Sequence, residues 1–130
     1  MKTIAEIKDF LYTLVYGNVC DVVYTSSLPK VLPDSLDSFA VVSTPSRISD
    51  ITDTRSMAFR RGSAVIALYT KNNPDGSENV VLQDSMEKAL QAAIASNSNT
   101  DYYIDIKNMY SVSSMEEYHV LIVLIDLTIK

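Results

Sequence analysis

The fold is decided near the end of the sequence, where residues 118–129 read YHVLIVLIDLTI. Odd-numbered positions from Leu121 to Ile129 are all apolar, which is the alternation expected when every second side chain of a strand lies on one buried face. The other face of this segment turns polar only near its end, at Asp126 and Thr128. The segment therefore predicts a long strand that is buried on one face and half-apolar on the other.

Four further strands are predicted from shorter apolar runs. The strand from about Met57 to Tyr69 has no polar face, and Gly62 inside it is a candidate β-bulge. The Thr44-Pro45 step is predicted to end the strand at Phe39–Ser43, because proline lacks a backbone donor. Residues 111–117 are predicted to be a connector. The remaining three strands are expected at Cys20–Tyr24, Phe39–Ser43 and around Tyr103–Ile106.

A helix is predicted from about Ile4 to Tyr16. Thr3 and Glu6 have the spacing of a capping box, in which each side chain accepts a hydrogen bond from an otherwise unpaired backbone N–H. Gly17 supplies the left-handed stop. The apolar residues recur at helical spacing and form one stripe: Ile4, Ile7, Leu11, Leu14 and Val15.

A second amphipathic helix is predicted from Glu78 or Asn79 to Ala95, so that the element order is α-β-β-β-α-β-β. This order predicts an α+β fold in which a largely antiparallel sheet of four to five strands packs against two helices. The length suits a single domain, 1–130, with a polar excursion at about 44–61 that forms an extended arm or a hairpin tip. Since two helices cover only one sheet face, the half-apolar second face predicts an interface.

The composition argues against several classes of partner. The chain has 11 basic and 16 acidic residues, a net charge of −5, which disfavours nucleic acid and anionic membranes. The longest apolar run is shorter than the roughly 20 residues that cross a bilayer. The amino-terminal residues lack the apolar stretch of a signal peptide. We therefore expect a soluble protein made in a cytoplasm, with no membrane and no sequence-specific nucleic acid as partner.

All four arginines of the chain, Arg47, Arg55, Arg60 and Arg61, fall within fifteen positions. Segment 47–61 has a net charge of +2, whereas the rest of the chain has −7. Guanidinium groups form paired hydrogen bonds with carboxylates, so the cluster predicts a docking strip for an acidic partner, including another copy of the chain. The alternative interpretation is a solvated loop whose arginines pair with nearby aspartates.

No catalytic motif is present, and we expect no enzyme, cofactor or metal. Cys20 and the single imidazole, His119, are the residues from which nucleophilic catalysis would have to be built, and both fall on predicted strands. Asp50 and Asp53 lack the further oxygen ligands of a cation site. We therefore assign Cys20 to the core, His119 to the sheet, and Asp50 and Asp53 to turns.

The order of elements resembles the tail-terminator and tail-completion proteins of long-tailed bacteriophages. The local features behind this resemblance are Leu28-Pro29, the polar excursion 44–61, the run 61–69 that leads through a turn into the second helix, and the closing strand 118–123. The resemblance implies a virion protein without catalytic residues that forms a ring, commonly a hexamer. Such a ring caps the tail tube and joins it to the head, with tail-tube and neck proteins as partners.

Two other functional classes remain open at this point. A small α+β enzyme or ligand-binding module would need a pocket with converging polar groups, for which Asp105, Lys107 and His119 are the starting set. An accessory or immunity-type protein would bind one acidic partner through Arg47–Arg61.

Overall fold

The strand predicted at residues 118–129 is β6 (Tyr118–Ile129), and it lies inside the sheet with a neighbour on each side. β6 pairs antiparallel along its whole length with β4 (Ala58–Lys71) and, at its other edge, with β5 (Tyr102–Met115). These are the three longest strands, and they form the frame of the molecule. The computed structural model describes residues 3–25, 37–43, 48–52, 58–99, 101–115 and 118–129.

The three shorter strands extend the sheet beyond β4. β2 (Ser38–Ser43) pairs antiparallel with the second half of β4, and β1 (Val23–Thr25) pairs parallel with β2. β3 (Ile48–Thr52) pairs antiparallel with the first half of β4. The order β1-β2-β4-β6-β5, with β3 beside β4, is antiparallel at every described pair except β1–β2. This confirms the α+β fold with a largely antiparallel sheet.

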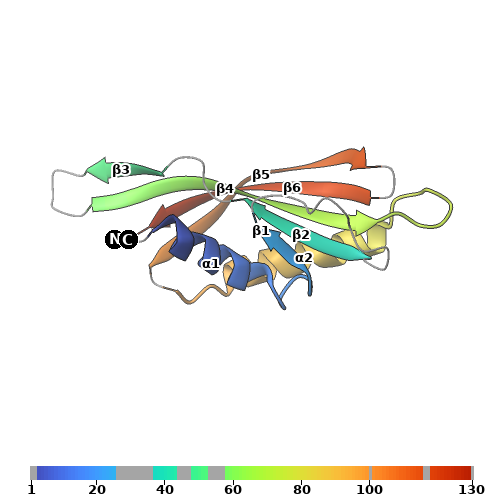
Figure 1. Ribbon diagram of the computed structural model, residues 1–130, viewed down its shortest axis with the longest axis horizontal. Coiled ribbons are helices and arrows are strands. Elements are labelled where there is room, and N and C mark those ends of the chain that lie inside the picture. Colours follow the sequence, from blue (N-terminus) through green and yellow to red (C-terminus); the bar gives the residue numbers. More distant parts are fainter. Residues whose placement is uncertain are drawn as a thin grey trace.

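Both helices, α1 (Ile4–Val15) and α2 (Val80–Ala95), lie on the same side of the sheet (Figure 1). α1 begins as predicted, because the Glu6 backbone N–H donates to Thr3 Oγ1 at 3.2 Å. Just past its end, Gly17 has a φ of 77°, a conformation that favours glycine. The side of the sheet under the helices is called the helix face, and the opposite side the second face.

The main core lies between the helices and the helix face. Three of the four buried residues of α1 belong to this core, and α2 adds Met86 and Leu90 to it. Ile4, by contrast, is 54% exposed, so the apolar stripe of α1 starts one turn later than predicted. The strand residues of this core alternate along β2, β4 and β6, as expected for one face of each strand: Ala40, Val42, Ala64, Ile66, Leu68, Val123, Ile125, Leu127 and Ile129.

Of the two alternatives predicted for the polar excursion, the structure has the hairpin, and the hairpin contains a strand that its own apolar pattern does not indicate. β3 and the first half of β4 pair with each other and form a hairpin, called the hairpin arm (residues 48–62). This adds a strand to the predicted element order, which becomes helix, four strands, helix, two strands. β3 has only two large apolar residues, Ile48 and Ile51, so its pairing with β4 rather than its own pattern makes it a strand.

The irregularities of the sheet lie in β5 and not in β4. The ladder runs through Gly62 without a break, so the bulge predicted there is wrong. β5 has 14 residues against 12 in β6, and two register shifts, after Ile106 and after Val112, absorb the difference. β5 also continues to Met115 through most of the connector predicted at 111–117.

Candidate functional site

The second face carries a buried cluster of its own. Its members come from β2, β4 and β6 and are Phe39, Val41, Ala67, Tyr118 and Val120. Both helices lie on the other side of the sheet, so no helix of the described part of the chain covers this cluster (Figure 1). The second face is therefore partly core and partly surface, and the boundary between the two decides which residues are available to a partner.

Four aromatic rings form the buried end of the second face. Phe39 is fully buried, stacks on Tyr69 with ring centroids 4.5 Å apart, and meets Tyr118 and Tyr24 edge-on at 5.2 and 5.7 Å. Burial raises the pKa of the Tyr69 hydroxyl. The prediction that the second face is surplus to a single chain is therefore wrong at this end, because the aromatic side chains pack against one another.

Further along the same face, apolar side chains remain accessible. Val65, Ile122 and Leu124 are half-buried, and Tyr110 is 47% exposed. Val65 lies opposite Leu124, and Ile122 lies opposite Tyr110, so the four residues occupy adjacent rows of the ladder. These four residues are called the open strip, and they are the part of the predicted interface that the described structure leaves partly accessible.

An acidic pair borders the open strip. Asp105 of β5 and Asp126 of β6 lie directly opposite each other on the second face, in the row next to Leu124. Asp105 and the neighbouring Ser63 of β4 are exposed, and Asp126 is half-buried. The open strip is thus apolar and is bordered at one end by two carboxylates.

Two of the four arginines of the predicted docking strip, Arg60 and Arg61, lie in β4. Arg60 lies opposite Asp50 and Ile129 in the ladder, whereas Arg61 lies opposite Ser49 and Thr128. Successive strand positions belong to opposite faces, so these two arginines occupy opposite faces of the hairpin arm. Arg47 and Arg55 lie outside the described residues, and the interface role of all four arginines stays a prediction.

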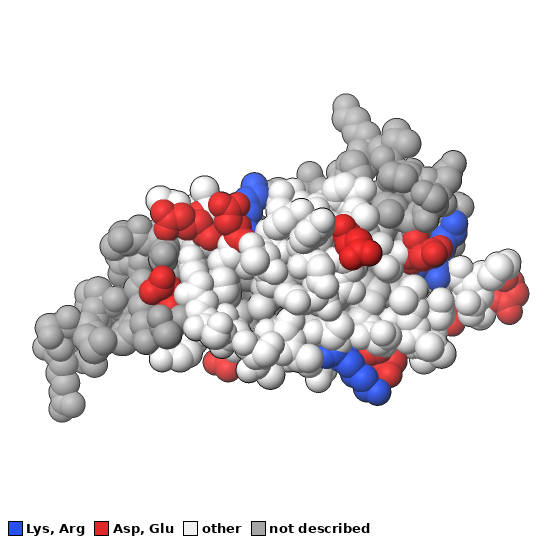
Figure 2. All heavy atoms as spheres, turned by 90° about the horizontal axis from the view of Figure 1, so that it is seen from below, with Lys and Arg blue, Asp and Glu red and all other residues white. Residues whose placement is uncertain are grey.

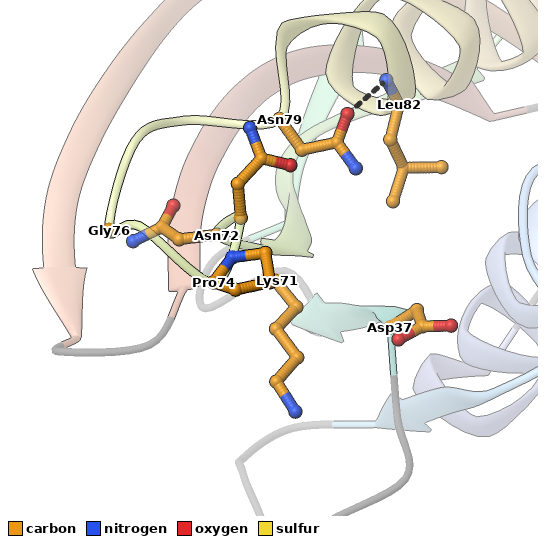
Figure 3. A pocket seen from close by; sticks show the side chains of 8 residues that line it. Asp37, Lys71, Asn72, Pro74, Gly76, Asn79 and Leu82 are labelled. Atoms are coloured by element: carbon orange, nitrogen blue, oxygen red, sulfur yellow. Dashed lines mark hydrogen bonds between the residues drawn. The ribbon is translucent and has the colours of Figure 1, made fainter.

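A groove of about 820 Å³ lies where β4 leads into α2 (Figure 3). At the wall of the groove, Asn79 Oδ1 accepts a hydrogen bond from the Leu82 backbone N–H at 3.2 Å. Asn72 Oδ1 is buried and has no hydrogen-bond partner in the described part of the chain. The described lining of the groove has no hydroxyl, thiol or imidazole, and its charged groups are the Asp37 carboxylate and the Lys71 ammonium. The lining residues are Asp37, Lys71, Asn72, Asn73, Pro74, Gly76, Asn79 and Leu82.

The residues considered for an enzyme or ligand site do not come together. His119 is 6% exposed, on the helix face, with Nδ1 3.2 Å from Glu78 Oε1. Asp105 lies opposite Asp126, which is seven residues along β6 from His119, or about 23 Å at the rise of a strand. Lys107 is exposed at the first register shift of β5. None of the three lines the groove.

Cys20 has the environment of a structural cysteine. It is 8% exposed, its Sγ lies 3.3 Å from the Val22 carbonyl oxygen, and burial raises its pKa to about 11. A thiol with that pKa is a poor nucleophile at neutral pH. Of the two aspartates considered for a cation, Asp50 lies in β3 and Asp53 lies outside the described residues. Among the described residues, no three His, Cys, Asp or Glu side chains gather as metal ligands.

Replacing Glu78 by alanine is expected to destabilise the fold by about 1–3 kcal/mol, because the buried His119 imidazole loses its partner. Urea denaturation measures the difference. Asp84→Ala is the control, since it breaks an exposed ion pair with Lys88 and should therefore cost less stability than Glu78→Ala. Equal effects of the two substitutions would mean that the His119–Glu78 contact is no stronger than a surface pair.

Sequence reasoning identified the apolar second face but missed the acidic pair and the groove. Asp105 and Asp126 are each visible as polar residues in apolar strands, yet only the register of β5 against β6 places them opposite each other. The groove depends on the path of the chain between β4 and α2. The asparagines at 72, 73 and 79 indicate a turn, and nothing in that pattern distinguishes a turn from a groove wall.

The charged side chains on the helical side of the molecule are described next to those of the second face. In Figure 2, which views the molecule from that side, the coloured charges are mostly acidic and no group of basic side chains stands out. Neither of the two described helices has the length and apolar content needed to cross a membrane. Comparison of the sequence with models of known protein families, and with curated proteins, finds no match.

Proposed function

We propose that this chain is a structural virion protein that assembles into a homo-oligomeric ring, caps or completes a phage tail tube and contributes to head–tail joining. The observation that carries the proposal is the open strip, an apolar area on β4, β5 and β6 that no described helix covers. Apolar area of this kind, bordered by charge, is typical of protein–protein contacts. The partners are other copies of the chain and the tail-tube and neck proteins.

The order of elements also supports the proposal. An amino-terminal helix, a group of strands, a second helix and closing strands is the plan that the resemblance implies, and α1, β1–β4, α2 and β5–β6 follow it. A ring requires that one surface of the subunit complement a different surface on the next. The open strip is the candidate for one of these two surfaces.

The test is to image concentrated protein by negative-stain electron microscopy and to measure its mass by light scattering. We expect closed particles, and we expect the variant Arg55→Glu/Arg60→Glu/Arg61→Glu to shift the mass toward the monomer, because reversed charges repel the acidic remainder of the chain. If the parent protein remains monomeric at the highest concentration and also when tail-tube protein is added, the proposal is wrong.

A further inference from the structure

The groove between β4 and α2 contains a polar atom that the described part of the chain leaves without a partner. Asn72 lines the groove, and its Oδ1 is buried and accepts no hydrogen bond from a described residue. A buried acceptor without a donor is costly in free energy and rare in folded proteins. A bound N–H group would remove that cost, so this atom points to a ligand that donates a hydrogen bond.

A second amide in the groove wall has the complementary group to offer. Asn79 Oδ1 accepts from the Leu82 backbone N–H, so the carbonyl half of this amide is engaged in capping α2. Its Nδ2 still carries two N–H donors. In Figure 3 the amides of Asn72 and Asn79 are both drawn toward the end of the groove that is nearer to α2. One acceptor and one donor match the N–H and the C=O of a peptide group.

The charged groups of the groove are drawn toward its other end (Figure 3). Asp37 is exposed, and its carboxylate forms no hydrogen bond or ion pair with a described residue. The Lys71 ammonium has three donors, so it can serve a ligand oxygen beside any other partner. A carboxylate and an ammonium in one part of a groove suit a ligand in which an ammonium is followed by a carbonyl, which is the amino terminus of a peptide.

Hydrogen bonds within its own walls hold the groove in shape. The Lys71 backbone N–H donates to the Asp37 carbonyl oxygen at 2.8 Å, which fixes the end of β4 against the start of β2. The turn before α2 is closed by two further backbone bonds of 2.8 Å, from Asn73 to Ser77 and from Gly76 to Asn73. Walls that are fixed before binding lose little conformational freedom when a ligand arrives.

We propose that the groove binds the amino-terminal residues of a short peptide, with the terminal ammonium at Asp37 and a backbone peptide group at Asn72 and Asn79. The volume of about 820 Å³ exceeds that of any single amino acid and lies within the range of about 300–1,000 Å³ that is usual for ligand sites. The groove shares no residue with the open strip, so this inference does not depend on assembly.

The experiment titrates the full-length protein, observed by NMR, with three probes: tri-alanine amide, the same peptide acetylated at its amino terminus, and n-butylammonium. We expect tri-alanine amide to cause saturable shifts at Asn72 and Asn79, with a dissociation constant of about 1 mM or below. Acetylation removes the charge, and n-butylammonium lacks the peptide groups, so each of these probes should bind about 10-fold more weakly or worse.

Two variants test the roles of the residues. Asp37→Asn should weaken tri-alanine amide about 10-fold and leave the acetylated peptide unaffected, because only the former carries the ammonium. Asn72→Leu should weaken both peptides, yet the ligand-free variant should resist urea at least as well as the parent, because leucine leaves no acceptor unpaired. A structural role of Asn72 would instead lower stability.

The matched control is Asp9→Asn, which removes one exposed carboxylate on α1 and should change no binding constant. Absence of saturable shifts with tri-alanine amide would overturn the proposal, and so would equal loss of both peptides in Asp37→Asn. Equal binding of n-butylammonium and tri-alanine amide would overturn the peptide as the class of ligand.

Discussion

Phe39→Ala is expected to destabilise the protein by about 3–5 kcal/mol, the cost of removing a fully buried aromatic ring and leaving a cavity behind. Phe39 has no exposed surface and packs against the rings of Tyr24, Tyr69 and Tyr118. The substitution removes the central ring of this cluster, and the remaining rings are too large and too constrained by their strands to fill the space. Chemical denaturation monitored by tyrosine fluorescence measures the loss.

The control for this prediction is Tyr16→Ala. Tyr16 also stacks on another ring, that of Tyr12 at 5.3 Å, but it is 51% exposed at the end of α1. Because most of its surface already contacts water, its loss should cost about 1 kcal/mol or less. If Phe39→Ala were as mild as Tyr16→Ala, the aromatic end of the second face would not be part of the core.

The elements that could be predicted are those whose own pattern is strong. β6 was identified from its alternation because five successive inward positions are large and apolar, and α1 from its cap and stripe. In both, the local sequence and the tertiary contacts favour the same structure. The α+β fold class follows from these elements and their order.

The elements that could not be predicted depend on partners far away in the sequence. β3 is a strand because β4 pairs with it, and the burial of Phe39 follows from rings that three other strands bring to it. The acidic pair depends on a register that two shifts in β5 determine. A one-residue difference in either shift would place Asp105 opposite a residue of the other face, and no sequence pattern specifies that count.

Leu124→Glu is expected to weaken assembly strongly while leaving the subunit folded. Leu124 is half-buried in the middle of the open strip, so a carboxylate there can remain hydrated in the single chain. In the assembled state the same carboxylate would be buried beside Asp126 without a cation of its own. Residues at the centre of an interface commonly contribute 2 kcal/mol or more, which corresponds to association weakened by roughly 30-fold or more.

Two controls make the prediction specific to the second face. Val123→Glu, one residue earlier, places the same charge on the fully buried helix face, so the protein should fail to fold. Val81→Glu replaces an apolar residue that is 83% exposed on α2, and it should change neither folding nor assembly. Sedimentation velocity and circular dichroism on the three variants separate these outcomes. If Leu124→Glu assembled as well as Val81→Glu, the open strip would not be a contact between subunits, since the alternation along β6 leaves Leu124 no other surface on which to act.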